Sequence, residues 1–163
     1  MTGYQEILTD PSYAGQIVTF TCPHIGIVGT NHEDKENTIP TNKGCVLGLE
    51  ITEPSNWRAN HDLNTWLKSH NISAITGVDT RRLTRRIRDK GFANGVILYP
   101  VENVSDLNNA YYAAQACPKL EGLDLAKKVT CAEEYFWNQS VWSKIQGYKV
   151  PYKSDYKVVA VDF

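Results

Sequence analysis

The feature that most constrains the fold is the order of patterns between residues 72 and 98. Ile72 to Val78 predicts a strand, Thr80 to Lys90 a helix, and Gly95 to Leu98 a second strand. Gly91 follows the helix, where glycine enters the left-handed conformation at little cost. A strand, a helix and a strand within about thirty residues predict a β-α-β unit with parallel strands. The sequence therefore predicts an α/β fold.

Two earlier segments add strands to this expected sheet. Residues 17–21 and 45–51 are rich in β-branched and apolar side chains, which favour extended structure. Residues 26–43 lie between them and are rich in Gly, Asn, Thr and charged residues, which is typical of a long exposed loop.

Two further helices are expected outside the β-α-β unit. Asn60 or Asp62 is suited to cap the first helix, and Ser105 is suited to cap the second. Asn, Asp and Ser side chains all accept backbone N–H groups at helix starts. The apolar face of the first helix would hold Leu63, Trp66 and Leu67. The residues of the second expected to face inward are Leu107, Ala110, Tyr111 and Ala114.

Composition and charge exclude several classes of function. Hydrophobic residues make up 42% of the chain and charged residues 21%, and the formal net charge is -1. This balance argues against a whole-domain field for nucleic acid or an anionic membrane. No apolar stretch approaches the roughly 20 residues that span a bilayer. No export signal is visible at the start of the chain, so we expect a cytoplasmic protein.

The four cysteines predict neither a metal site nor disulfides. Cys22, Cys45, Cys117 and Cys131 lie far apart and include no C-x-x-C pair, whereas zinc sites normally contain a close pair of ligands. In a cytoplasmic protein we expect reduced thiols. None of the four lies in a nucleophile-elbow sequence. We therefore predict no catalytic residue and no metal in this chain.

The helix at residues 80–90 carries an unusual arginine cluster. At 100° per residue, Arg81, Arg85 and Arg88 share the face opposite Leu83 and Ile87. Three interpretations remain open from the residues alone. The face is solvated, as most charge runs are, or it contacts another subunit, since arginine is enriched at interfaces. Phosphate or nucleic-acid binding is the third interpretation.

The two ends of the chain predict that it is part of a longer protein. Residues 143–156 resemble a linker, and 157–163 predict a strongly apolar strand that ends with the chain. Residues 4–11 resemble sequence from within a domain. We therefore expect a domain over residues 1–142 whose leading strands are absent, a linker over 143–156, and the first strand of a following domain over 157–163.

Several motifs resemble the small subunit of glutamine-dependent carbamoyl phosphate synthase. They are M-T-G-Y-Q-E-I-L-T-D-P-S-Y at residues 1–13, S-N-W-R at 55–58, D-T-R-R-L-T-R-R-I-R-D-K-G at 79–91, G-L-D-L-A-K-K-V-T at 122–130 and V-V-A-V-D-F at 158–163. They follow the family's order along the whole chain. Ile27 departs from the family, in which many members have Asn after P-x-I-G.

The resemblance implies an N-terminal β/α domain that precedes a class I glutaminase domain with a Cys-His-Glu triad. That triad releases ammonia from L-glutamine. The large subunit then uses ATP and Mg, with bicarbonate, to make carbamoyl phosphate for pyrimidine and arginine synthesis. Residues 1–163 lack the triad, so this chain alone is expected to be inactive and to hold no cofactor.

The resemblance also implies two roles for residues of this chain. The serine of T-D-P-S-Y, here Ser12, contributes to the glutamine site. The N-terminal domain packs against the large subunit, which favours an interface at Arg81, Arg85 and Arg88. The alternative is a free-standing interaction module that uses the arginine-rich helix. Neither nucleic acid nor a membrane is expected as a partner.

Overall fold

The structure is a computed structural model that describes residues 3–150 and 156–161. The chain divides into two compact units, residues 1–123 and residues 124–163. The predicted domain end at residue 142 stays a prediction, because a division by contacts does not define a domain boundary.

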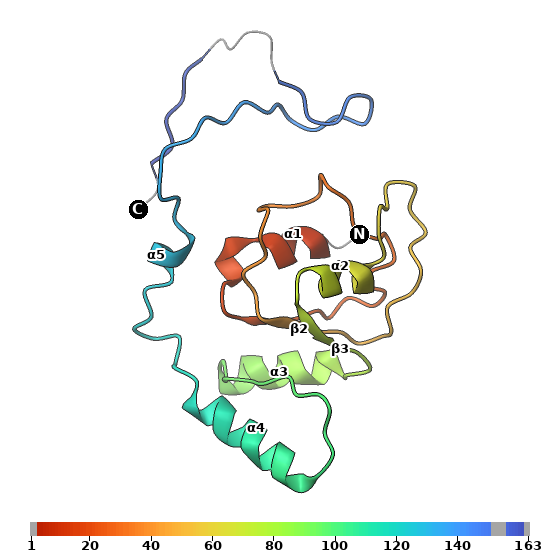
Figure 1. The fold of residues 1–163 in the computed structure, drawn as a ribbon, viewed down its shortest axis with the longest axis vertical. Coiled ribbons are helices and arrows are strands. Elements are labelled where there is room, and N and C mark those ends of the chain that lie inside the picture. Colours follow the sequence, from red (N-terminus) through yellow and green to blue (C-terminus); the bar gives the residue numbers. More distant parts are fainter. Residues whose placement is uncertain (1–2, 151–155, 162–163) are drawn as a thin grey trace. The chain divides into compact units, whose positions relative to one another are not determined.

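A small parallel sheet organises the first unit (Figure 1). Its strands are β1 (Ile17–Thr19), β2 (Gly44–Val46) and β3 (Ser73–Ile75), in the order β1-β2-β3. Cys45 of β2 pairs with Val18 on one side and Ala74 on the other. β2 is buried along its length, whereas every residue of β3 is exposed. The α/β prediction is confirmed, although each strand is shorter than predicted.

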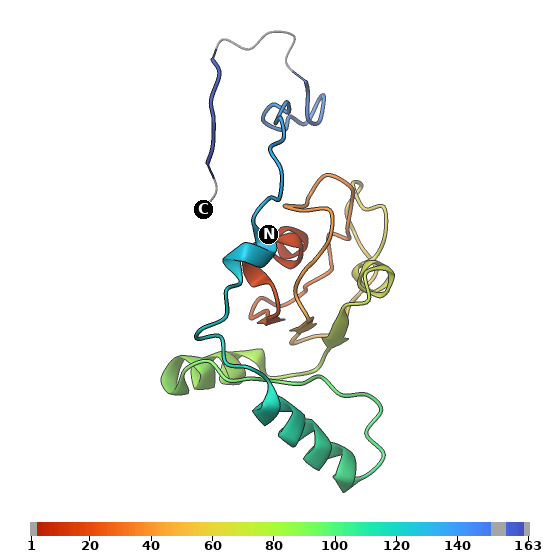
Figure 2. The ribbon, with the colours of Figure 1, turned by 60° about the vertical axis from the view of Figure 1, so that its left-hand side comes forward.

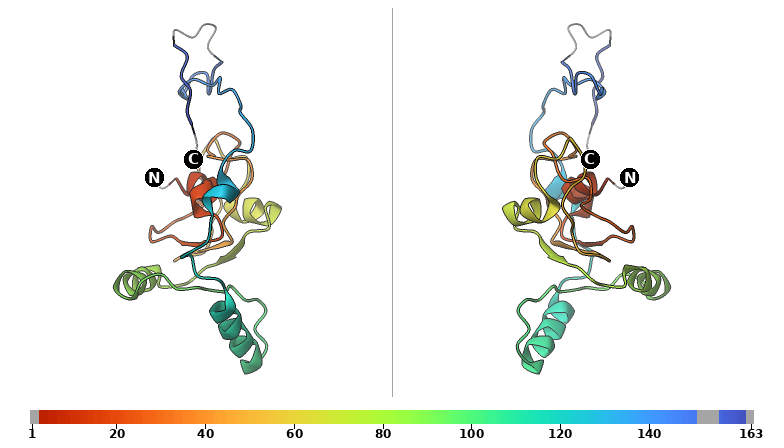
Figure 3. Two further views of the ribbon diagram at one scale, coloured as in Figure 1. Left: turned by 90° about the vertical axis from the view of Figure 1, so that its left-hand side faces the viewer. Right: turned by 90° about the vertical axis from the view of Figure 1, so that its right-hand side faces the viewer.

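Two short helices cover one face of this sheet, while the arginine-rich helix lies on the other side (Figure 3). They are α1 (Tyr4–Thr9) and α2 (Leu63–Ser69). Asp62 caps α2 by accepting the backbone N–H of Thr65 at 2.9 Å, so of the two predicted caps Asp62 is the one that forms. The core contains Tyr4, Leu8, Phe20, Ile25, Cys45, Leu47, Leu63, Trp66, Leu67 and Ile72.

The β-α-β unit lies earlier in the chain than predicted. β2, α2 and β3 form the parallel crossover, whereas residues 95–98 form no strand. The side chain of Ile97 instead packs over β2, because a Cβ added at Gly44 would lie 2.8 Å from its Cδ1. The predicted strand at residues 95–98 is therefore wrong. The Ile97 side chain packs on the sheet, and its backbone does not pair with an edge strand.

The arginine-rich helix α3 (Thr80–Lys90) forms as predicted. Asp79 accepts the backbone N–H of Arg82 at 2.9 Å, and Gly91 ends the helix with a φ of 84°. Figure 2 shows α3 followed by an irregular segment that leads into the next helix.

That next helix, α4 (Val104–Ala116), differs from prediction in its cap and its exposure. Asn103 caps it through a reciprocal pair of contacts with Asp106, so the predicted Ser105 cap is wrong. Leu107 and Tyr111 are 55% and 61% exposed rather than inward-facing, and Ala110 and Ala114 are half-buried.

The second unit has little regular structure in its described part. It contains α5 (Ala126–Val129) and an isolated bridge between Ser143 and Gly147. Residues 157–161 form no strand, and residues 162–163 of the predicted strand lie outside the described residues. The predicted linker also falls partly outside them, at 151–155. None of the described helices is both long and apolar enough to cross a bilayer.

Candidate functional site: the Ser12 turn and its support

Ser12 lies in a tight turn that directly follows α1. Pro11–Tyr13 form a single 3₁₀ turn, and Asp10 accepts the backbone N–H of Ser12 at 2.8 Å. The side-chain amide of Gln16 donates to the Ser12 carbonyl oxygen at 3.1 Å. The backbone of Ser12 is thus held from both sides. Its side chain is exposed, and its hydroxyl bonds to no described residue.

Three side chains of α1 attach it to the loop at residues 29–36. The Tyr4 hydroxyl donates to the Gly29 carbonyl oxygen. Gln5 donates to the carbonyl oxygen of Asn31 at 2.6 Å and accepts the N–H of Asn31 at 2.9 Å. The hydroxyl of Thr9 accepts the backbone N–H of Glu36 at 2.9 Å. Because all three residues are buried, α1 is fixed along its length.

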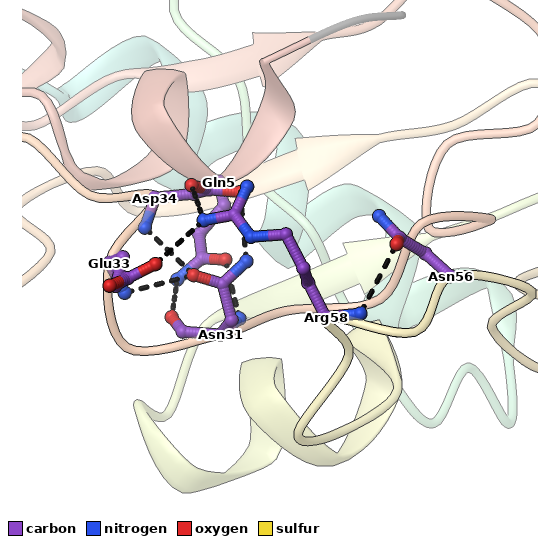
Figure 4. A network of polar contacts seen from close by, with 6 residues as sticks. All are labelled: Gln5, Asn31, Glu33, Asp34, Asn56 and Arg58. Atoms are coloured by element: carbon purple, nitrogen blue, oxygen red, sulfur yellow. Dashed lines mark hydrogen bonds and ion pairs between the residues drawn. The ribbon is translucent and has the colours of Figure 1, made fainter. Parts of the chain in front are cut away.

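Arg58 links this loop to the S-N-W-R motif (Figure 4). Its Nη1 and Nη2 lie 3.2 and 2.7 Å from the two carboxylate oxygens of Asp34, and Nη2 also lies 3.0 Å from Glu33 Oε2. Asn31 donates to Asp34 at 2.8 Å. A planar guanidinium matches a carboxylate in this two-point geometry, so the pair fixes direction as well as distance.

Burial and neighbouring charges shift the pKa values of Arg58, Glu6 and Tyr4 in this region. Burial acts to lower the pKa of Arg58, but its hydrogen bonds to Asp34 and Glu33 outweigh burial and raise the pKa overall. Burial raises the pKa of Glu6, and the charges of Asp34 and Glu36 raise it further. Burial likewise raises the pKa of the Tyr4 phenol, so Tyr4 acts as a hydrogen-bond donor and not as a base.

The P-H-I-G segment at residues 23–26 forms a tight bend. His24 and Gly26 have φ angles of 60° and 102°, and the N–H of Ile27 bonds to the His24 carbonyl oxygen at 3.3 Å. The backbone N–H of Ser55 bonds to the Ile27 carbonyl oxygen at 2.9 Å. Because this contact uses the backbone and the Ile27 side chain is 39% exposed, the bend accommodates the departure from Asn.

The predicted interface arginines all lie exposed on α3. Arg88 approaches Asp89 at 3.2 Å, in a pair whose side chains are 72% and 60% exposed, so this contact adds little stability. No hydrogen bond or ion pair between described residues joins Arg81, Arg85 or Arg88 to the Ser12 turn. These residues therefore form a separate surface from Ser12.

The described residues contain no arrangement suited to nucleophilic or metal chemistry. All four cysteines are free thiols. Cys45 is buried in the centre of the sheet, and burial raises the pKa of its thiol to about 11, which disfavours the reactive thiolate. Nowhere in the described ranges do three or more His, Cys, Asp or Glu side chains gather as a metal site would require.

The sequence did not reveal the residues that support the Ser12 turn. Gln5 and Thr9 carried no assigned role, and Arg58 appeared only as part of a recognisable motif. The pairing of Arg58 with Asp34 spans 24 positions, and nothing local to either residue predicts it. Two adjacent acidic residues in the loop, Glu33 and Asp34, are a signal for a cationic partner, but the sequence does not identify Arg58 as that partner.

Comparison with known proteins places these features in a family. Residues 1–97 match the family model described as carbamoyl-phosphate synthase small chain, CPSase domain. The chain is 50% identical over 163 residues to the carbamoyl phosphate synthase small chain of Ruegeria pomeroyi, and 48% identical over 167 residues to that of Brucella anthropi. Each alignment covers 100% of this chain, but 42% and 41% of the respective relative.

The fold is that of a small parallel α/β domain, and the matches give its family. The chain belongs to the carbamoyl-phosphate synthase small chain family, which confirms the resemblance seen in its motifs. It spans about two-fifths of the length of the curated relatives that it matches.

Proposed function

We propose that this chain is the N-terminal domain of the glutamine-hydrolysing subunit of a carbamoyl phosphate synthase. In the complete protein, a glutaminase domain releases ammonia from L-glutamine, and a large subunit uses ATP and Mg to convert ammonia and bicarbonate into carbamoyl phosphate. In this proposal the chemistry belongs to the glutaminase domain and to the large subunit. The role of this chain is to complete the glutamine site and to bind the large subunit in the cytoplasm.

The observation that carries this proposal is the presentation of Ser12. Its backbone is held by Asp10 and Gln16, while its hydroxyl is exposed and free of bonds to described residues. A hydroxyl held in this way is able both to donate to a carboxylate and to accept from an ammonium or amide group, and glutamine carries all three. A rigid backbone limits the entropy lost when the ligand binds.

The test uses a complete small chain that contains these residues, assembled with a large chain. We expect Ser12→Ala to raise the KM for glutamine about 10- to 100-fold, since one hydrogen bond to a charged group is worth about 1.5–3 kcal/mol. Activity with ammonia in place of glutamine should not change. Ser105→Ala, at an exposed serine of α4, is the control. An unchanged KM in Ser12→Ala would remove Ser12 from the glutamine site.

The proposed contact with the large subunit uses the arginines on one face of α3. Arg81, Arg85 and Arg88 are exposed, and Arg88 also approaches Asp89 of the same helix. We expect Arg81→Ala/Arg85→Ala/Arg88→Ala to abolish pull-down of the large chain. The control Arg82→Ala/Arg86→Ala/Lys90→Ala removes the same charge from another face of α3. Equal loss of binding in both would indicate a general effect of charge instead of a defined interface.

A further inference from the structure

The contacts around Arg58 form a continuous path to the turn that carries Ser12. Arg58 holds Asp34 at two points, and Asp34 accepts from Asn31. The side-chain oxygen of Asn31 in turn accepts the backbone N–H groups of Glu33 and Asp34, each at 2.9 Å. The loop at residues 31–34 is thus closed on itself, and Arg58 fixes it from outside (Figure 4).

The second part of the path runs from this loop into α1. The Asn31 backbone and the Gln5 side chain exchange two hydrogen bonds, at 2.6 and 2.9 Å. Gln5 is only 4% exposed, so water competes poorly for these bonds. Because the Gln5 side-chain amide both donates to and accepts from the Asn31 backbone, the two bonds fix the orientation of α1 relative to the loop as well as the distance between them. A shift of the loop therefore moves α1 with it.

The last part of the path runs from α1 to Ser12. The N–H of Asp10 bonds to the carbonyl oxygen of Ile7 at 3.4 Å, and the Asp10 side chain accepts the N–H of Ser12 at 2.8 Å. The 3₁₀ turn is thus a direct extension of the helix. Since the Ser12 side chain is itself exposed, packing does not hold it. Its position follows from that of α1.

We propose that Arg58 is a positioning residue for Ser12, acting through Asp34, Asn31 and Gln5. This inference rests on the proposed function, because it gives Ser12 a glutamine ligand to meet. Without the planar guanidinium, Asp34 is no longer held at two points, so the loop at residues 31–34 loses the contact that fixes its direction. The loop then shifts and carries α1 with it through the Gln5–Asn31 bonds, so the Ser12 hydroxyl moves away from its productive position.

The test measures glutamine-dependent and ammonia-dependent activity of the complete small chain assembled with a large chain. We expect Arg58→Lys to raise the KM for glutamine about 10-fold, because small misplacements cost large factors in binding and rate. Lysine keeps the charge but loses the two-point geometry, so folding is expected to be retained. The ammonia-dependent rate should be unchanged. Lys68→Ala, at an exposed lysine of α2, controls for a change at a surface cation.

The double variant Ser12→Ala/Arg58→Lys distinguishes positioning from general weakening of the structure. If Arg58 acts through Ser12, the double variant has the same KM as Ser12→Ala alone. Multiplied effects of the two changes would overturn the inference, as would an unchanged KM in Arg58→Lys while Ser12→Ala raises it. An unchanged KM in Ser12→Ala would overturn the proposed role of Ser12, and the inference with it.

Discussion

The hydroxyl of Thr9 accepts the backbone N–H of Glu36 at 2.9 Å while it donates to the carbonyl oxygen of Gln5 at 2.8 Å. One 2%-exposed side chain therefore joins the end of α1 to a loop 27 positions further along the chain. Thr84 makes a similar bond back into its own helix, to the Thr80 carbonyl oxygen at 2.9 Å, but its side chain bonds to no other segment among the described residues. The two threonines therefore differ in one contact, the hydrogen bond between Thr9 and the backbone of Glu36.

Replacing Thr9 tests this contact. We expect Thr9→Val to lower the free energy of unfolding by about 1 kcal/mol, because the backbone N–H of Glu36 loses the buried Thr9 hydroxyl as its acceptor. Thr84→Val should change it by less than about 0.5 kcal/mol, since bonds back into the helix contribute little. Urea unfolding followed by circular dichroism measures both. Equal losses in the two variants would show that the contact with Glu36 does not stabilise the fold.

Gly44 is expected to tolerate no side chain. A Cβ at this position would lie 2.7 Å from the backbone oxygen of Ser73 and 2.8 Å from Ile97 Cδ1, whereas one at Gly48 would meet Thr80 Oγ1 at 3.4 Å. We expect Gly44→Ala to cost about 1–3 kcal/mol through overpacking and Gly48→Ala to cost much less. Melting temperatures of the two variants, measured side by side, check the order. A smaller loss in Gly44→Ala than in Gly48→Ala would contradict the close approach of β2 and β3.

Glu6 is expected to reduce stability at neutral pH. Burial and neighbouring carboxylates raise its folded-state pKa, so the folded state holds its proton more tightly. The protonated form of Glu6 is tolerated in the fold, so Glu6 costs no stability below its unfolded pKa. Stability is lost as the pH rises through the higher folded pKa and the buried carboxyl ionises. Glu6→Gln should be more stable than wild type at pH 7, and the gain should disappear below about pH 4. Glu53→Gln, at an exposed position, controls for net charge.

Asp62 should show the opposite dependence on pH. The hydroxyl and backbone N–H of Thr65 lower the pKa of this carboxyl, so its stabilising effect is present above the unfolded pKa and is lost as the pH falls through the lower folded pKa. At pH 7, Asp62→Ala should cost about 1 kcal/mol, while Asp62→Asn keeps a good cap. Unfolding curves at pH 7 and pH 3 check both. A difference between wild type and Asp62→Ala that grows on acidification would contradict this role.

The helices were the more predictable part of the fold. Asp62 and Asp79 each accept a backbone N–H three residues away, and Gly91 ends α3 through its positive φ, so their roles are visible in short stretches of sequence. The Asn103–Asp106 pair also carried a local signal, an N-cap residue followed three positions later by an acidic one. The predicted cap, Ser105, lies between these two residues, which exchange side-chain and backbone hydrogen bonds with each other. The helix at residues 4–9 was missed.

The sheet and the support of the candidate site were less predictable because they depend on distant contacts. Strands of three residues carry too little pattern to identify their partners. Ile97 has the composition of a strand residue, yet its side chain lies over Gly44 instead of in a ladder. The same limit applies to Arg58, whose carboxylate partners lie more than twenty positions away. A sequence motif indicated Ser12 as a candidate residue, whereas only the structure shows which residues hold its backbone.

The burial of Cys45 gives the chain an internal reporter of core opening. The other three cysteines are exposed, so a thiol reagent reaches them at once. Cys45 has no exposed surface and a pKa of about 11, so it reacts only in molecules whose central strand has separated from its neighbours. The slow appearance of a fourth modified thiol, counted by mass spectrometry, therefore measures how often the sheet opens under native conditions.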